Sequence, residues 1–281
     1  MKTTRILILL GLTLLVLTGC YKNPHTGKMQ YIDMDAEREM TLGMQGFTNI
    51  QIQYPKASEE MTERIQRIAD RITPLADRPN YNWEVFVAES DTFNASCYPG
   101  GKIVFYSALV DALETDEAIA LVMGHEITHA LLRHTADKIT RLEFIQALTQ
   151  LAATQMQTAQ QVRDLNTLVG TSTTIGVMLP LSRENEFDAD RIGLILATKA
   201  GFDTHKAALG LNVLVENRKK AKYEAPEYLA THPHPQNRQD RLKAMAQDIH
   251  DTYAPKNLGG QEKPLLWLDI ATPEEVLADA Q

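Results

Sequence analysis

The sequence predicts a mainly helical α+β fold with a small β-sheet beside one buried helix that carries two histidines. Apolar residues recur at helical spacing over most of the chain, as between Met61 and Ile72. Only two short segments, 83–88 and 102–106, have the alternating or β-branched pattern of strands. A length of 281 residues and a hydrophobic content of 44% are enough for one large domain with a substantial core.

Residues 1–19 are expected to be the signal peptide of a lipoprotein. Lys2 and Arg5 form a charged start, an apolar run follows, and residues 17–20, Leu-Thr-Gly-Cys, resemble a bacterial lipobox. The apolar run is shorter than the roughly 20 residues that span a bilayer. Cleavage would leave Cys20 as the acylated N-terminus and anchor the protein to a membrane. An ordinary secretory signal with a chance cysteine is the alternative.

Tyr21 follows the lipobox cysteine, in place of the Asp that retains lipoproteins of diderm bacteria in the inner membrane. The inner leaflet of the outer membrane, facing the periplasm, is therefore the expected location. Cys97 is then the one remaining cysteine, and we expect a buried thiol. Pairing with another chain, or with Cys20 if the lipobox interpretation is wrong, remains open. The net charge of −8 argues against nucleic acid as a partner.

Residues 20–35 are expected to form a lipid-anchored tether without regular structure that docks onto the domain. Amphipathic helices are predicted over 36–50 and 58–76 as scaffold. The strands at 83–88 and 102–106 follow, the second after a Pro-Gly-Gly turn, so a small sheet should precede the histidine helix.

The histidine helix should begin at Thr115, a good N-cap residue that is followed by two acidic residues. After it, residues 137–178 read as helices that form either a lid beside the site or an ordinary helical hairpin. Pro180 and Ser182 should start the next long helix, which Gly201 ends.

Two more helices, near 205–221 and 237–250, close a domain that is expected to span 36–255. A C-terminal tail over 256–281 follows.

The pentapeptide His125-Glu126-Ile127-Thr128-His129 places two histidines on one helical face, four residues apart, so both rings can reach one metal ion. A catalytic zinc site needs a third protein ligand, and Glu186 is the best candidate because Asp190 lies one turn further and can support a ligand histidine. Glu126 points about 100° around the helix, close enough to act as a base. A core helix with two satisfied histidines is the alternative.

These residues resemble the zinc metallopeptidase family forty-eight, of gluzincin type, which includes the bacterial envelope proteases HtpX, BepA and LoiP and the prenyl-protein proteases. Further motifs that match in order are Asn23 to Lys28, Asn94-Ala95, Pro99 to Ile103, Ser182-Arg183, Glu186 to Asp190, and Thr231-His232-Pro233 with Arg238. The match spans roughly residues 21 to 240. The resemblance implies a zincin-like metalloprotease domain.

By the same resemblance, His125, His129 and Glu186 bind one Zn²⁺ per chain, Glu126 is the catalytic base and Asp190 supports a ligand histidine. The resemblance also places Asn94 and Ala95 at a sheet edge that binds substrate. An exposed edge strand can hold an extended peptide through main-chain hydrogen bonds.

His232 can approach the metal by that resemblance, and three roles remain open for it. It could donate to the oxyanion of the reaction, occupy the fourth coordination position, or be a loop histidine without a role. His134 follows His129 by five residues, and we expect a cation at a helix C-terminus there.

The function expected is a zinc metalloendopeptidase that degrades unfolded or misassembled envelope proteins, with the outer-membrane assembly machinery as a possible partner. The alternative is an assembly factor for outer-membrane proteins with a latent or regulatory zinc site. An intact Glu126 favours the enzyme, because a binding module needs no base there.

Overall fold

A computed structural model describes residues 20–176, 183–213, 216, 228, 232 and 235–255. Several sequence-based expectations lie outside these residues. They are the signal peptide over 1–19, the helix start at Pro180 and Ser182, most of the segment after residue 213, and the tail over 256–281.

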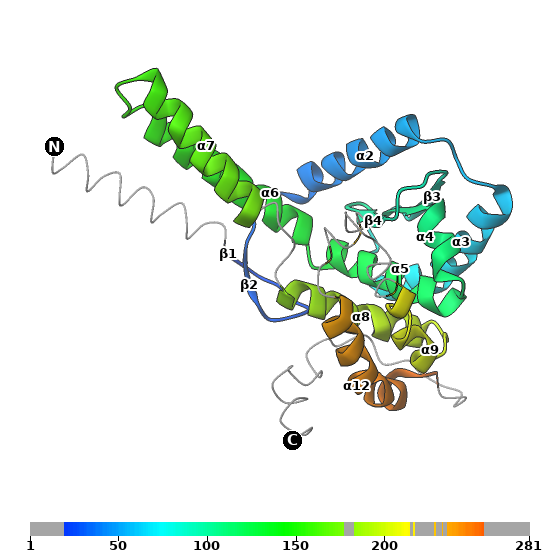
Figure 1. Cartoon of the computed structure of the whole chain (residues 1–281). Helices are drawn as coiled ribbons and strands as arrows, with labels where there is room; N and C mark the ends of the chain where they lie inside the picture. Colours follow the sequence, from blue (N-terminus) through cyan, green and yellow to red (C-terminus); the bar gives the residue numbers. More distant parts are fainter. Residues whose placement is uncertain are drawn as a thin grey trace.

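The body of the molecule is a three-stranded sheet packed on a central helix, α5 (Asp116–Leu131), which packs in turn on α8 (Arg183–Lys199). The strands are β3 (Glu84–Ala88), β4 (Ala95–Tyr98) and β5 (Lys102–Tyr106), in the order β3-β5-β4 (Figure 1). β3 pairs parallel and β4 antiparallel with β5. The mainly helical α+β fold and both predicted strands are confirmed, whereas β4 was not predicted.

Two helices precede the sheet, as the apolar spacing indicated. α2 (Ala36–Gln53) begins at Asp35, whose carboxylate accepts a hydrogen bond from the Arg38 amide. α3 (Glu59–Ile72) begins at Ser58 in the same way and buries Ile65, Ile68 and Ile72 against the core. The last predicted turn, Thr73–Ala76, is a 3-10 helix, because Pro74 lies at its start and cannot donate a helical bond.

α4 (Ser107–Leu113) is followed by α5, which begins as expected: the Thr115 hydroxyl accepts a hydrogen bond from the Ala118 amide. All residues of α5 from Ala118 to Leu131 are buried, so its polar side chains depend mainly on partners inside the protein.

The crossing of α5 and α8 is very close. A Cβ atom added to Gly124 would lie 2.6 Å from the Gly193 carbonyl oxygen, and one added to Gly193 would lie 2.6 Å from the His125 amide nitrogen. Any side chain at either position would hold the helices apart. The two glycines therefore set the distance between the histidine motif on α5 and the acidic motif on α8.

α6 (His134–Ala153) and α7 (Ala159–Gly176) form a helical hairpin that projects from the body (Figure 1). Of the two alternatives for this region, a lid or a helical hairpin, the structure shows the helical hairpin. Arg133, between α5 and α6, has a left-handed backbone with φ of 56°, which breaks the helix and changes the chain direction after Leu132.

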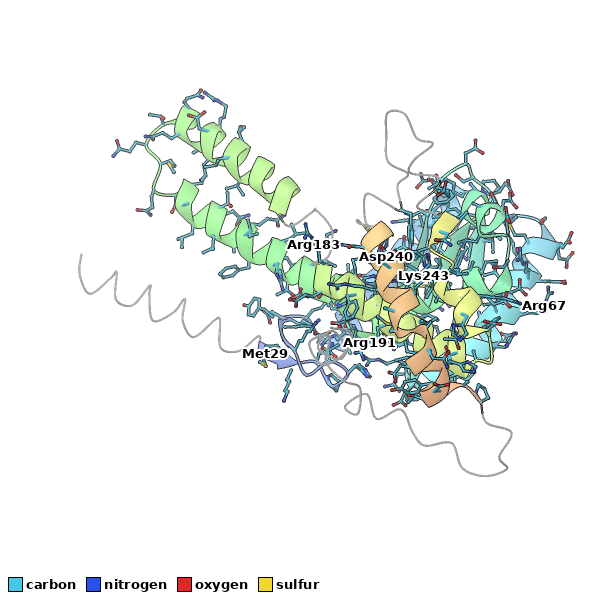
Figure 2. All side chains as sticks on the ribbon, turned by 60° about the horizontal axis from the view of Figure 1, so that its bottom comes forward. Met29, Arg67, Arg183, Arg191, Asp240 and Lys243 are labelled. Carbon is cyan, nitrogen blue, oxygen red and sulfur yellow. The ribbon has the colours of Figure 1, made fainter. Side chains whose placement is uncertain are left out.

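The N-terminal segment differs from the expectation of an irregular chain. Residues 20–22 and 29–31 pair antiparallel as β1 (Cys20–Lys22) and β2 (Met29–Tyr31). Between them Gly27 adopts a φ of 67°, which a turn of this kind requires. Asn23 is fully buried and donates to the Leu132 carbonyl, whereas Met29 is 62% exposed at the far side of the hairpin (Figure 2).

The last two helices follow α8, which ends at Gly201 with a φ of 79° as expected. α9 (Thr204–Ala208) is much shorter than the predicted helix near 205–221, because a turn at 209–211 interrupts it. α12 (Pro235–Tyr253) packs on α8 and exposes Asp240 and Lys243 on its outer face (Figure 2). Within the described part of the chain, no helix combines the length and apolar content needed to cross a membrane.

Candidate metal centre

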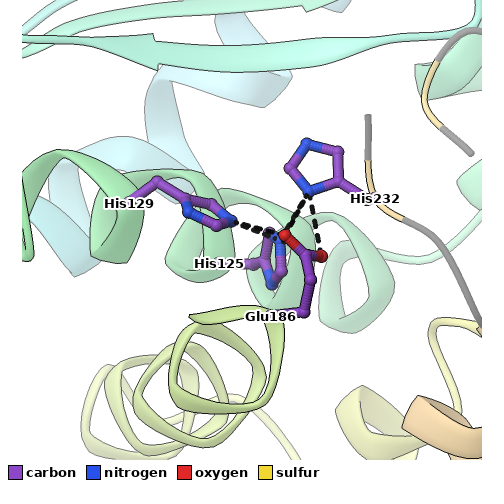
Figure 3. A group of neighbouring side chains, drawn as sticks. All are labelled: His125, His129, Glu186 and His232. Carbon is purple, nitrogen blue, oxygen red and sulfur yellow. Dashed lines mark hydrogen bonds and ion pairs between the residues drawn. The ribbon is translucent and has the colours of Figure 1, made fainter. Parts of the chain in front are cut away.

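α5 presents its two histidines on one face, as the four-residue spacing predicts. The Nε2 atoms of His125 and His129 lie 2.9 Å apart, and the ring centroids 4.6 Å apart. Both side chains are buried. Figure 3 shows the two rings converging on the same point from successive turns of the helix.

α8 brings Glu186 to that point. Its carboxylate oxygens lie 3.5 Å from His125 Nε2 and 3.4 Å from His129 Nε2. His232, from the segment that precedes α12, completes the cluster with Nδ1 3.1 Å from His125 Nε2 and from a Glu186 oxygen. The four residues are buried, and each offers a ligand atom within 4.8 Å of the others.

The donor atoms fit a metal ion. The Asp190 carboxylate lies 2.9 Å from His125 Nδ1, so the ring proton is on Nδ1 and the lone pair of Nε2 faces His129 and Glu186. Lone pairs and a carboxylate that face one another need a cation between them. Ligand atoms at about 2.0–2.2 Å from a tetrahedral ion lie about 3.3–3.6 Å apart, which is close to the separations found here.

An arginine orders the side of the cluster that faces α12. Arg238 donates from Nε to Asp190 Oδ2 at 2.7 Å and from Nη2 to Asp190 Oδ1 at 2.6 Å, and its Nη1 lies 3.0 Å from Glu186. Burial alone would raise the pKa of Asp190, but Arg238 outweighs it and lowers that pKa to about 2. Asp190 therefore stays ionised and holds the His125 ring, as the sequence suggested.

His134 differs from its expected role as a cation at a helix C-terminus. It is the first residue of α6, it is buried, and its Nδ1 lies 2.7 Å from His129 Nδ1. Burial lowers the pKa of His134 to about 3, so the ring is neutral. With His129 Nε2 directed at the cluster, His129 Nδ1 donates to His134, which orients His129 as Asp190 orients His125.

Glu126 is buried beside the cluster and does not belong to the group of potential ligands. Its Oε1 lies 3.5 Å from His232 Nε2, yet has no hydrogen-bond partner among the described residues. Burial raises the pKa of Glu126, and His232 and His125 oppose that effect. A carboxylate with a free acceptor oxygen and a raised pKa is suited to accept a proton from a bound water.

Burial and neighbouring charges also set the charge states of the other cluster residues. Burial lowers the pKa of His129 well below its ordinary value, which keeps its imidazole neutral. Burial would raise the pKa of Glu186, but His232 and Arg238 reverse the effect and lower it. The pKa of His232 is raised despite its burial, because the carboxylates of Glu126 and Glu186 are close.

β4 is an edge strand beside α5. The Tyr106 amide donates to the Asn94 carbonyl, so Asn94 and Tyr106 form a hydrogen-bonded pair of the antiparallel ladder. Hydrogen-bonded and non-hydrogen-bonded pairs alternate along such a ladder, so the main-chain groups of Ala95 and Cys97 point away from β5. Among the described residues no strand pairs with that outer edge. Asn94 and Ala95 thus lie at the start of this unpaired edge, where Ala95 is 2% exposed and the Asn94 side chain accepts from the Ala95 amide.

Tyr228 links the edge strand to His232, a connection that the sequence did not suggest. Its amide donates to the Phe93 carbonyl at 3.0 Å, its carbonyl accepts from the His232 amide at 2.8 Å, and its ring stacks on the His232 ring at 4.4 Å. Cys97 is a free, buried thiol, as expected, and burial raises its pKa.

Three relatives and a family model show what the chain is similar to. The model described as Peptidase family M48 matches residues 59–246. The mitochondrial metalloendopeptidase OMA1 of Arabidopsis thaliana is 36% identical over 167 residues, which cover 59% of this chain and 31% of that protein. The beta-barrel assembly-enhancing protease of Escherichia coli (strain K12) is 30% identical over 184 residues, 63% of this chain and 37% of that protein.

The mitochondrial metalloendopeptidase OMA1 of Saccharomyces cerevisiae is 23% identical over 261 residues, which cover 86% of this chain and 74% of that protein. The first relatives are longer: the chain covers 31%, 54% and 37% of their lengths. The region that the family model matches contains the histidine and acidic motifs whose side chains form the buried cluster.

Proposed function

The chain belongs to peptidase family M48, and on that premise we propose that it is a zinc endopeptidase that cleaves unfolded or misassembled proteins of the cell envelope. That it is a metallopeptidase follows from the family and from the buried cluster. The observation that carries the proposal is the juxtaposition of this cluster with a Glu126 carboxylate oxygen that has no hydrogen-bond partner among the described residues.

The donor set His125, His129 and Glu186 suits zinc, which would polarise the scissile carbonyl and lower the pKa of a bound water. Glu126 takes the proton of the attacking water and returns it to the leaving amine, since its Oε1 lies beside His232 and has no hydrogen-bond partner within the described part of the chain.

His232 has two roles that its position supports. Its Nε2 lies on the Glu126 side of the cluster and can donate to the carbonyl oxygen as negative charge develops there. Its Nδ1 lies among the ligand atoms, so the ring can instead hold the fourth position until substrate displaces it.

The outer edge of β4, with which none of the described strands pairs, supports a broad choice of substrates. A peptide that pairs with Ala95 and Cys97 is held through main-chain groups, which every sequence possesses. Only an extended chain can pair in this way, so unfolded segments are favoured over folded ones.

The lipobox at residues 17–20 supports an envelope location, with Cys20 as the lipid anchor on the periplasmic face of the outer membrane. The name of the beta-barrel assembly-enhancing protease assigns that relative to β-barrel assembly, which supports envelope proteins as substrates here. A second candidate function is an assembly factor whose metal site is latent. It is favoured by the position of His232 within the ligand cluster.

The experiment that separates these functions uses the purified full-length chain, loaded with zinc, and casein as an unfolded substrate. The enzyme proposal expects cleavage that a chelator abolishes and added zinc restores. Glu126→Gln should keep its zinc and lose turnover by about 10²- to 10⁴-fold, because it removes the base and no ligand. Cleavage that is indifferent to the chelator, or a Glu126→Gln variant as active as the unchanged chain, would refute the mechanism.

A further inference from the structure

The N-terminal hairpin of β1 and β2 contacts both helices that carry the metal cluster, although none of the four cluster residues lies in it. One contact reaches the end of α5 through Asn23 and Gln30. The other reaches the first turn of α8 through Lys28 (Figure 1). Each contact ends close to a residue of the metal centre.

The contact with α5 is made at the carbonyl of Leu132, the residue that caps this helix. Asn23 Nδ2 donates to the carbonyl oxygen at 3.2 Å, and Gln30 Nε2 donates to it at 2.9 Å. The last carbonyls of a helix have no donor within the helix, so these two amides pair with a group that α5 itself leaves open. Asn23 is fully buried, and its Oδ1 accepts from the His25 amide, which fixes the orientation of its side chain.

Only one residue separates Leu132 from the ring that orients His129. That residue is Arg133, whose left-handed backbone turns the chain into α6, and His134 follows it with Nδ1 2.7 Å from His129 Nδ1. Arg133 also donates to Glu39, so the turn is held by α2 on one side and by the hairpin on the other. A shift of the Leu132 peptide group therefore moves the His134 ring.

The contact with α8 is made at Asp188, whose side chain is 4% exposed and whose Oδ2 accepts from Lys28 Nζ at 2.7 Å. A buried carboxylate requires a compensating charge. Arg191, also on α8, carries a second positive charge near Asp188, but only Lys28 of these two comes from another segment of the chain. Asp188 follows Glu186 by two positions and so projects about 200° around the helix, which means that Lys28 holds α8 from the face opposite the cluster.

The position of this ion pair is important because Glu186 lies in the first turn of α8. Helix ends fray, so a first turn depends on contacts from outside the helix. Arg238 provides such a contact on the cluster side, with Nη1 3.0 Å from Glu186, and Lys28 provides one on the outer side. Loss of Lys28 frees the turn on one side and lets the Glu186 carboxylate move relative to His125 and His129.

We propose that Asn23 and Lys28 are positioning residues of the metal centre, so that the docked hairpin is part of the site. Asn23 acts on His129 through the turn after α5, and Lys28 acts on Glu186 through the first turn of α8. The proposal rests on the zinc site of the proposed function. Cys20, the proposed lipid anchor, is the first residue of β1, so the anchor would be attached directly to an element that holds the site.

The first test replaces Lys28, whose side chain is 40% exposed and can be changed without opening the core. In the purified full-length chain, Lys28→Met should lower zinc affinity about tenfold, as for residues that orient a metal ligand. Lys28→Arg keeps the charge and should recover most of the affinity. The matched control is Lys22→Met, which removes the same charge from an exposed position of the same hairpin. Unchanged affinity in Lys28→Met, or an equal loss in Lys22→Met, would overturn the role of Lys28.

The second test concerns Asn23 and the route by which it acts. Asn23→Asp keeps the shape and the acceptor for the His25 amide but removes the donor to Leu132, and it should lower zinc affinity about tenfold. In a chain that already carries His134→Ala, the same change should have little effect, because the ring through which it acts is gone. An equal loss in both backgrounds would refute this route.

Lys28→Met should instead act equally with and without His134→Ala, because its route runs through α8. If Asn23→Asp fails to fold, Gln30→Glu removes the other donor to Leu132 from a half-buried position and is tested in the same two backgrounds.

Cobalt(II) in place of zinc distinguishes positioning from a general loss of stability, because its visible absorption bands depend on the arrangement of the ligands. At full occupancy, Lys28→Met and Asn23→Asp should shift these bands, and Lys28→Arg should restore them. A lowered Tm with the cobalt spectrum of the unchanged chain would show that the hairpin only stabilises the fold, and the proposal would fail.

Failure of this proposal and failure of the peptidase function give different results, because zinc affinity and the cobalt spectrum need no turnover. If the unchanged chain does not cleave casein, the peptidase function is refuted, whereas the expected shifts in affinity and spectrum would still support the hairpin as part of the metal centre. If the unchanged chain cleaves casein and the variants match it in affinity, spectrum and rate, only the role of the hairpin is refuted.

Discussion

Gly193 lies at the close crossing of α5 and α8 and is not one of the potential metal ligands, yet we predict that replacing it weakens zinc binding. In Gly193→Ala, the new Cβ would lie 2.6 Å from the His125 amide nitrogen and 2.9 Å from the Gly124 carbonyl carbon. Atoms in ordinary contact are about 3.5 Å apart, so the helices must separate by about 0.9 Å at this point. Glu186 lies two turns before Gly193 on the same rigid helix and must follow part of that movement.

Metal sites tolerate ligand displacements of about 0.2 Å, so we expect zinc affinity to fall at least about tenfold. The overpacked core should lose about 1–3 kcal/mol of unfolding free energy, which lowers Tm by about 2–4 °C for each kcal/mol in a domain of this size. Competitive zinc titration and thermal unfolding with and without zinc measure the two effects. Ile65→Val, in the core on α3, should cost about 1 kcal/mol and leave the affinity unchanged. Wild-type zinc affinity in Gly193→Ala would refute the role of this crossing.

Four further changes test single residues of the site and the anchor. Glu186→Ala should lower metal content and abolish proteolysis; full zinc occupancy with unchanged activity would remove Glu186 from the ligand set. His134→Ala should weaken zinc binding about 10- to 100-fold, since it releases the His129 ring, and an unaltered titration curve would mean that the 2.7 Å contact has no such role. His232→Ala should lower the catalytic rate about a hundredfold if the residue donates to the developing oxyanion, or raise it if the residue blocks the fourth position; no change in rate or zinc content would exclude both. Cys20→Ala should move the protein from the membrane fraction to the soluble fraction without altering its intrinsic activity, and retention in the membrane would contradict lipid anchoring.

The parts of the site that lie on one helix could be read from the sequence. The spacing of His125 and His129 fixes their common face, and the spacing of Glu186 and Asp190 does the same on α8, because a helix repeats every 3.6 residues. Thr115 marks the start of α5 by its hydroxyl, and two strands follow from their apolar pattern. Such features depend on residues a few positions apart.

The sequence-based reading failed where the backbone changes direction. The prediction for His134 assumed that α5 continues through residue 134. In the structure Arg133 has a left-handed backbone conformation, which ends the helix and places the His134 ring against the His129 ring. β4 was missed because its four residues are too few to show a period. The prediction of a helix near 205–221 did not take Gly210 into account. Gly210 lies in the turn that interrupts this helix, and a Cβ atom added to it would lie 3.0 Å from the Ala118 Cα.

What the sequence by itself determined is therefore which faces of α5 and α8 carry His125, His129 and Glu186, and the helices on which they lie. Only the tertiary structure decided that Arg238 pairs with Asp190 and Glu186, that Tyr228 joins His232 to the segment before β4, and that Arg133 pairs with Glu39. These contacts join residues far apart in the chain. Helical periodicity relates only neighbours, whereas distant partners are selected by how whole elements pack, through features such as the two glycines at the crossing of α5 and α8.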